Sequence, residues 1–234
     1  MNALRSASHA LLLSALVMLG SPAHATDVQG KVMLGAYKPA PETQSVGRPF
    51  NWEVENGFKE TKKDRIDARR EIAVVLVGKT RADGEKHVEL KFSGGSLLPS
   101  TVVVRAGATV RITNSDEVAH ELFAEGLEGF SAEATSPRGM RSIAMREAGN
   151  WPLRDRLIPH LRGHLHVIAD LVAVAKVDER GSYSFSDVLP GSYTLKVFHG
   201  PDEVGSSQVE VGSKKLSVDP ITATAKAKAK AEKK

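Results

Sequence analysis

Short apolar stretches separated by turn residues run through most of the chain and predict β-strands. In the stretch ATVRITNSD, Val110 and Ile112 alternate with polar neighbours, and this period of two is typical of a half-buried strand. The run IAVVLVG at 72–78 is continuously apolar and of strand length, as expected for a strand buried on both faces. The pattern favours sheet throughout the middle of the chain.

Other stretches of the same kind complete a set of short strands with frequent Gly or Pro between them. One charge-dense segment, 58–71, is the exception and predicts a short exposed helix. Many short strands and few helical patterns indicate an all-β sandwich. The further predicted strands are 28–35, 87–92, 100–107, 141–149, 165–177, 181–200, 206–212 and 214–219.

Both ends of the chain differ from the middle. The apolar run ALLLSALVML followed by Ala-His-Ala at 23–25 predicts a signal peptide over 1–25, and therefore a periplasmic or secreted protein. That run is too short to span a bilayer, so we expect no transmembrane segment. The Lys-rich 219–234 predicts a disordered tail that carries most of the net charge of +4. A tail of this kind predicts weak contact with anionic surfaces rather than binding of nucleic acid.

Composition removes several classes of chemistry. The chain contains no Cys, which excludes a thiol nucleophile, a thiolate-ligated zinc site and a blue-copper thiolate. The motifs G-x-S-x-G and H-E-x-x-H and the phosphate-binding P-loop are also absent from the sequence. We therefore expect a protein that is not an enzyme.

One part of the chain resembles the cupredoxins, the plastocyanin-like periplasmic proteins. The stretch LLPSTVVVRAGATVRITNSDEVAHELFAEG looks like the first half of that fold, and His120 stands at its first copper-ligand position. In GNWPLRDRLIPHLRGHLHVI, His160 takes the position of the second His. The resemblance places Leu157 at the Cys position and Gly163 at the Met position, so the ligand motif is only half matched.

The following stretch, VDERGSYSFSDVLPGSYTLKVFHG, looks like a carboxypeptidase regulatory-like β unit. The resemblances imply a cupredoxin-like Greek-key β-sandwich with an appended small β unit. The predicted division is a signal peptide at 1–25, an N-terminal strand and polar region at 26–71, the cupredoxin-like sandwich at 72–175, the regulatory-like unit at 176–218 and the disordered tail at 219–234.

Histidines support one hypothesis of function, a non-redox metal site. The cupredoxin resemblance implies that His120 and His160 meet at one end of the sandwich. His164 and His166 point to the same side of an extended segment, so either could replace the missing ligands. Imidazoles suit Cu(II), Zn(II) or Ni(II), and intrinsic affinity favours a Cu(II) site of type 2 character. The candidate ligands are His120, His160, His164 and His166.

A second hypothesis is a metal-free envelope module that binds a protein or polysaccharide partner. Its basis is a group of arginines close to the candidate ligands, whose positive field opposes binding of a dication. Arginines also make planar, bidentate contacts with carboxylate and phosphate groups. They are Arg138, Arg141, Arg146, Arg154, Arg156 and Arg162. The sequence leaves both hypotheses open.

Overall fold

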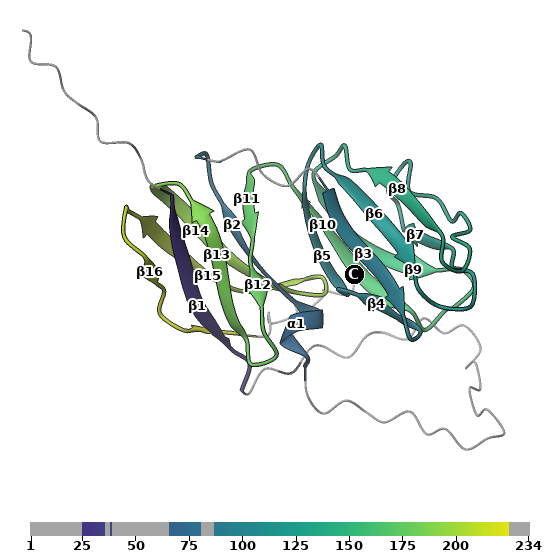
Figure 1. Ribbon diagram of the computed structural model, residues 1–234, viewed down its shortest axis with the longest axis horizontal. Coiled ribbons are helices and arrows are strands. Elements are labelled where there is room, and N and C mark those ends of the chain that lie inside the picture. Colours follow the sequence, from purple (N-terminus) through teal and green to yellow (C-terminus); the bar gives the residue numbers. More distant parts are fainter. Residues whose placement is uncertain (1–24, 36–37, 39–65, 81–86, 225–234) are drawn as a thin grey trace, which may run out of the picture.

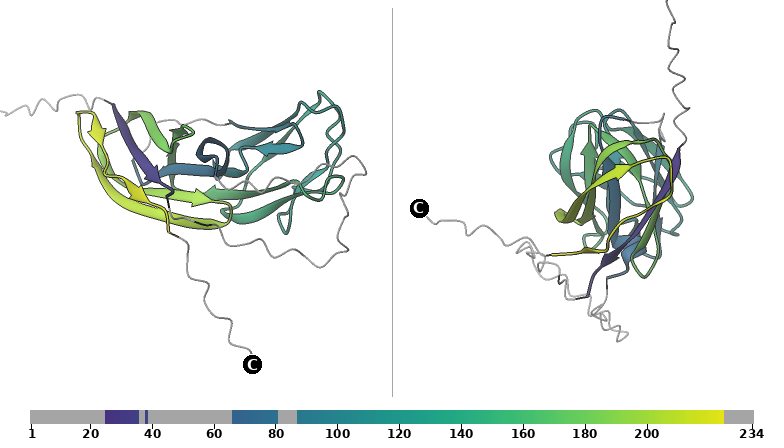
Figure 2. Two further views of the ribbon diagram at one scale, coloured as in Figure 1. Left: turned by 90° about the horizontal axis from the view of Figure 1, so that it is seen from below. Right: turned by 90° about the vertical axis from the view of Figure 1, so that its left-hand side faces the viewer.

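The computed structural model describes residues 25–35, 38, 66–80 and 87–224. They form two β-sandwiches that lie side by side, as Figures 1 and 2 show. The fold class is all-β, as predicted; the one helix of the described part is the single turn α1 (Ala68–Glu71). The predicted signal peptide, except Ala25, and most of the charge-dense segment lie outside the described residues. No helix among the described residues is long and apolar enough to cross a bilayer.

The first sandwich combines strands from both ends of the chain. Its first sheet has the order β12-β13-β1-β16, and β17 also pairs with β1; its second sheet has the order β11-β2-β14-β15. The strands of the first sheet are β12 (Lys176–Val177), β13 (Ser182–Val188), β1 (Thr26–Met33), β16 (Leu216–Ser217) and β17 (Ile221–Thr222). Those of the second are β11 (Leu171–Val174), β2 (Ile72–Val77), β14 (Gly191–His199) and β15 (Asp202–Val211).

The second sandwich is built from one continuous part of the chain. Its sheets have the orders β4-β3-β6-β8 and β5-β10-β9-β7. The first comprises β4 (Ser96–Leu98), β3 (His87–Ser93), β6 (Thr109–Asn114) and β8 (Met140–Ala144). The second comprises β5 (Thr101–Arg105), β10 (Arg162–Ile168), β9 (Gly149–Asp155) and β7 (Leu122–Ala124).

Parallel pairs in the second sandwich join strands that are distant in sequence. β3 pairs with β6, and β5 pairs with β10, both in parallel register. The alternation predicted for β6 is confirmed, because Val110 and Ile112 are fully buried while their neighbours are partly exposed. Apolar side chains of both sheets fill a core that is separate from the core of the first sandwich.

The second sandwich is inserted into the first, which differs from the predicted division of the chain. β2 at 72–77 and β11 at 171–174 are predicted to belong to the cupredoxin-like unit. In the structure β11 pairs with β2 and β2 pairs with β14, so both strands lie in a sheet of the first sandwich. β2 is buried at every position, as its apolar run predicted. One of its faces fills the core of the first sandwich, and the other contacts Val103 and Phe198 between the two sandwiches. An apolar run predicts burial but not the identity of the pairing strand.

The C-terminal boundary also differs from the prediction. The sequence predicts a disordered tail from residue 219, but Ile221 and Thr222 form β17 and pair with β1. Ile221 and Ala223 are buried in the core of the first sandwich. The alternation of apolar and polar residues from Ile221 to Thr224 explains this result, because such a period suits a strand at a sheet edge.

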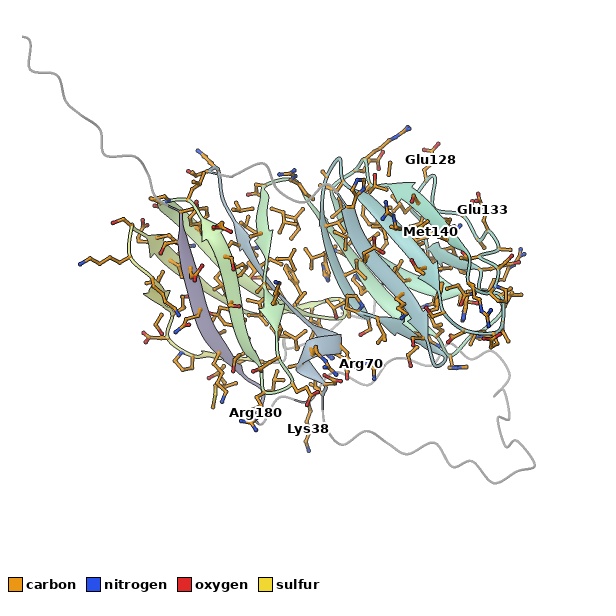
Figure 3. All side chains as sticks on the ribbon, viewed as in Figure 1. Lys38, Arg70, Glu128, Glu133, Met140 and Arg180 are labelled. Atoms are coloured by element: carbon orange, nitrogen blue, oxygen red, sulfur yellow. The ribbon has the colours of Figure 1, made fainter. Side chains whose placement is uncertain are left out.

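Polar contacts join the two sandwiches close to α1, the helix that carries Arg70 (Figure 3). The Ser100 amide donates to the Arg70 carbonyl over 2.8 Å. The Thr101 hydroxyl donates to the Glu71 carbonyl over 2.6 Å and accepts from the Gly200 amide over 2.8 Å. These bonds fix β5 of the second sandwich against β2 and the β14–β15 hairpin of the first.

Candidate functional site

His120 lies between β6 and β7, at the end of the second sandwich, and its ring is fully buried. Its backbone forms a two-way bridge with Thr135, and the ring stacks on Phe92 with a centroid separation of 3.9 Å. Nδ1 is 3.1 Å from Oδ2 of Asp155, and Nε2 is 3.1 Å from Oδ2 of Asp116. Both ring nitrogens therefore face a carboxylate oxygen.

Asp155, the last residue of β9, holds the surrounding loops as well as the imidazole. Its Oδ1 accepts from the amides of Leu157 and Ile158 at 2.9 and 2.8 Å, and its Oδ2 accepts from the amide of Glu121 at 3.2 Å. The side chain is buried, so these donors replace the water that a carboxylate needs. One carboxylate thus connects the loop after β9 to the segment that carries His120.

Asp116 performs a similar role on the other side of the ring. Its carboxylate accepts from the amides of Gly94 and Gly95, over 2.6 and 3.1 Å, in the turn between β3 and β4. Asn114 completes the network: its side-chain amide donates to the carbonyls of Val118 and Thr135. The result is a closed polar network that ties the ends of β3, β6 and β9 together around His120.

The other two positions of the expected ligand motif offer no metal ligand. Leu157, at the Cys position of the resemblance, is half exposed. Gly163, at the Met position, lies in β10, and a Cβ there would come within 2.7 Å of Leu97 Cδ2 and 2.9 Å of the Ser100 carbonyl oxygen. That backbone position therefore has no room for a side chain. His160 lies in the turn between β9 and β10, exposed at the surface.

His164 and His166 lie together, but on a different face of the molecule from His120. Both project from β10 opposite Leu165 and Val167, which belong to the core of the second sandwich. Their rings are 4.8 Å apart, and the His166 ring packs against Phe198 of the first sandwich at 4.4 Å. Nε2 of His166 donates to the Gly200 carbonyl over 2.7 Å. These two histidines therefore form part of the interface between the sandwiches.

The predicted set of four histidines is not assembled at one point. Among the residues that the structure describes, no group of three or more His, Cys, Asp or Glu side chains is placed to hold a metal ion. Two residues of the network around His120, Asp116 and Asp155, are not among the site residues predicted from the sequence. The signal for Asp116 is its position four residues before His120; the contact of Asp155 with His120 joins residues 35 positions apart and has no local signal.

The pKa values of the two interface histidines, His164 and His166, are lowered, which favours their neutral forms. Burial lowers the pKa of His164 to about 4, and the nearby charges of His166 and Arg154 act in the same direction. Burial also lowers the pKa of His166, although its bond to the Gly200 carbonyl and the neighbouring Asp202 and Glu203 oppose the shift. Both imidazoles are therefore neutral at pH 7.

An open groove of about 710 Å³ lies away from all four histidines, on the outer face of the first sheet. Outward-facing side chains of four adjacent strands line it, and it is largely polar. The lining includes Gln29, Lys31, Lys176, Ser184 and Ser217. No histidine contributes to it, so it has no connection with the expected metal chemistry.

Comparisons with known proteins give cupredoxins as structural neighbours. The amicyanin of Paracoccus versutus matches with 25% identity over 42% of this chain and 97% of its own, at a TM-score of 0.32. A reduced amicyanin variant matches with 16% identity over 36% of this chain and 84% of its own, also at 0.32. The copper-containing nitrite reductase of Thermus scotoductus matches with 18% identity over 34% of this chain and 22% of its own, at 0.32. No family model and no curated protein matches the chain.

Replacing Asp155 tests whether its carboxylate organises this end of the sandwich. Asp155→Ala leaves three backbone amides and the His120 ring without their acceptor, so we expect the free energy of unfolding to fall by about 3 kcal/mol or more. Urea denaturation measures the loss, and Asp170→Ala, at an exposed position, is the control with an expected change within about 0.5 kcal/mol. A change in Asp155→Ala as small as that of the control would contradict this role.

The interface histidines predict a loss of stability in acid. In the unfolded chain His164 takes up a proton near pH 6.5, whereas in the folded protein it does so near 4, so lowering the pH between these values favours unfolding. We expect His164 to contribute a loss on the order of 2–3 kcal/mol across that window. Urea titrations from pH 7.5 to 4 measure it. His164→Gln should flatten the pH dependence, and exposed His87→Gln should leave it unchanged; equal profiles in the two variants would refute the prediction.

Proposed function

We propose that this protein is an exported, non-enzymatic, cupredoxin-like module that binds a partner protein of the cell envelope without a resident metal. The observation that carries the proposal is the engagement of both ring nitrogens of the buried His120 by carboxylates, the buried Asp155 on one side and the partly buried Asp116 on the other. A metal bound at His120 needs a lone pair from one of those nitrogens. Neither nitrogen faces open space.

The donor set does not fit a copper centre of the cupredoxin type. A blue-copper site requires a thiolate, and the chain contains no Cys. The position of the Met ligand is a glycine without room for a side chain. Withdrawing Asp155 from its ring contact to admit a cation would disturb the carboxylate that holds the amides of Leu157 and Ile158. Metal uptake would therefore disrupt the loops that make up the end of the sandwich.

The same network supports binding of a protein, because it fixes exposed apolar side chains. Val118 is 53% exposed and Leu157 is 50% exposed. The Val118 carbonyl accepts from Asn114, and the Leu157 amide donates to Asp155, so both residues stand on loops held by buried polar groups. Met140, 61% exposed, begins the strand that pairs with the end of β6. Apolar groups on a rigid backbone lose little conformational entropy on binding.

Two ion pairs involve the sequence neighbours of Val118 and Leu157. Arg138 pairs with Glu117 over 3.2 Å, and Arg156 pairs with Glu121. Apolar anchors within a charged rim are the usual composition of a transient protein interface. The arginines that the sequence analysis grouped near the histidines thus include two that lie beside this surface, each already paired with a glutamate.

A copper titration tests the metal-free part of the proposal. We expect the mature protein to show no stoichiometric Cu(II) site with nitrogen hyperfine structure in its EPR spectrum at pH 7. Any weak signal should fall in His160→Ala and in His87→Ala, because an exposed surface histidine binds Cu(II) loosely. One equivalent of tightly bound Cu(II) that survives in His160→Ala would refute the metal-free assignment.

An interface substitution tests the partner-binding part. Leu157→Glu places a charge on the apolar surface without touching the core, so we expect it to reduce capture of the envelope partner by at least about tenfold. Val174→Glu is the matched control, since Val174 is 47% exposed but lies on β11 of the first sandwich. Quantitative pull-down from envelope extracts compares the variants with the wild type. Equal capture by all three proteins would contradict binding at this end.

A further inference from the structure

β15 is the long edge strand of the described structure. It lies at the end of the order β11-β2-β14-β15, and nine of its ten residues pair on one side with β14, Val204 falling at a shift of register. Other edge strands in the described part, β4, β7, β8, β11, β12 and β16, span two to five residues. β5 is also an edge strand, but it packs against β2 and β11 of the first sandwich. In Figure 2 the β14–β15 hairpin runs along an outer side of the molecule.

The hydrogen-bond pattern of the sheet shows which groups of β14 point toward β15. The Ala175 amide donates to the Val74 carbonyl, so the backbone groups of Val74 point toward β11. Because these groups alternate along a strand, those of Val75 point the other way, toward its partner Lys196 in β14. The backbone groups of Lys196 therefore point toward β2. Those of the residues on either side of it, such as Leu195, point toward β15.

The same alternation identifies the outward-facing groups of β15. Leu195 pairs with Ser207, so the backbone N–H and C=O groups of Ser207 point toward β14. Those of Ser206, Gln208 and Glu210 point the other way, away from β14 at the free edge of the sheet. An independent contact agrees: the carbonyl of Val204 accepts from Thr224, on the side away from β14. Because the Val204 carbonyl is already bonded to Thr224, the edge that is free among the described residues begins at Gly205. It ends with the strand at Val211.

This edge lacks the features that usually prevent edge-to-edge pairing. From Gly205 to Val211 it contains no Lys and no Pro, and its register with β14 has no bulge in that span. Its one charged side chain is Glu210, which accepts a hydrogen bond from the Ser192 hydroxyl at 2.7 Å. A long, regular edge strand without such protection is a template for another strand.

We propose that a second copy of this chain pairs with β15 in antiparallel register, about a two-fold axis at Gln208. The free edge from Gly205 to Val211 is centred on Gln208, so the two copies cover it completely. Gln208 then pairs with Gln208, and Ser206 pairs with Glu210 at both ends. Each pair exchanges two backbone hydrogen bonds, which gives about six in total and a continuous sheet across the dimer.

The side chains fit this register better than its neighbours. Glu210 of each copy stands opposite Ser206, so no like charges face each other, and the two Gln208 amides can bond to one another. Moving the axis to Glu210 would bring the two carboxylates together. Moving it to Ser206 would pair Val204 with Gln208 of the second copy. That pairing needs the Val204 carbonyl as an acceptor, but this carbonyl already accepts a hydrogen bond from the Thr224 amide. The side chains of β15 and the contact of Thr224 with Val204 therefore select one register and favour a second copy as the occupant.

Sedimentation of the mature protein over a range of concentrations tests the dimer. One strand pair buries less surface than a standard interface, so we expect reversible association, with the weight-average mass rising toward twofold at about 1 mM. Gln208→Pro removes an outward-facing N–H without breaking the ladder with β14 and should keep the protein monomeric. Circular dichroism confirms that the variant is folded.

A charge-swap pair tests the register. Gln208→Lys and Gln208→Glu should each be monomeric, because each places like charges across the axis, and an equimolar mixture should regain the twofold mass. Ser184→Lys, on the outer face of β13, is the control and should associate like the wild type. A wild-type protein that stays monomeric up to about 1 mM, or a dimer that Gln208→Pro leaves intact, would overturn the proposal.

Discussion

The buried carboxylate of Asp155 is the constraint on which the candidate site depends. Asp155 is the last residue of β9. Its carboxylate accepts hydrogen bonds from backbone amides on both sides of the site and contacts Nδ1 of His120. A buried carboxylate is tolerated only when donors replace its lost hydration, and here every donor is fixed by the sandwich. His120, which the sequence resemblance places at a copper-ligand position, is part of a polar network that holds loops in place.

A second constraint acts between the two sandwiches. β2 and β11 belong to the first sandwich, yet they pack against β5 of the second, and Phe198 and His166 meet at the same boundary. The interface buries two neutral imidazoles, the Thr101 hydroxyl and an apolar cluster. It is therefore similar to a protein core rather than to a loose contact between domains. His164 and His166, which the sequence predicts as candidate ligands, contribute to packing between the two units.

The two sandwiches expose features of different character. The network around His120 presents rigid loops with apolar side chains, which suits recognition of a protein surface. The long edge of β15 offers backbone groups, which suits pairing with another strand. Both proposals, partner binding beside the His120 network and strand pairing at β15, rest on contacts between protein chains.

The sequence by itself determined the strands and the limits of the chemistry. The period of two in β6, the wholly apolar run of β2 and the absence of Cys are local properties, and each led to a correct expectation or a firm exclusion. Tertiary structure alone decided which strands pair, and so it moved residues 72–77 and 171–174 into the first sandwich and gave Ile221 a place in its core. It also decided that His164 and His166 face an interface, while His120 meets Asp155. Apolar periodicity specifies which face of a strand is buried, but the partner of that face depends on contacts between residues far apart in the chain.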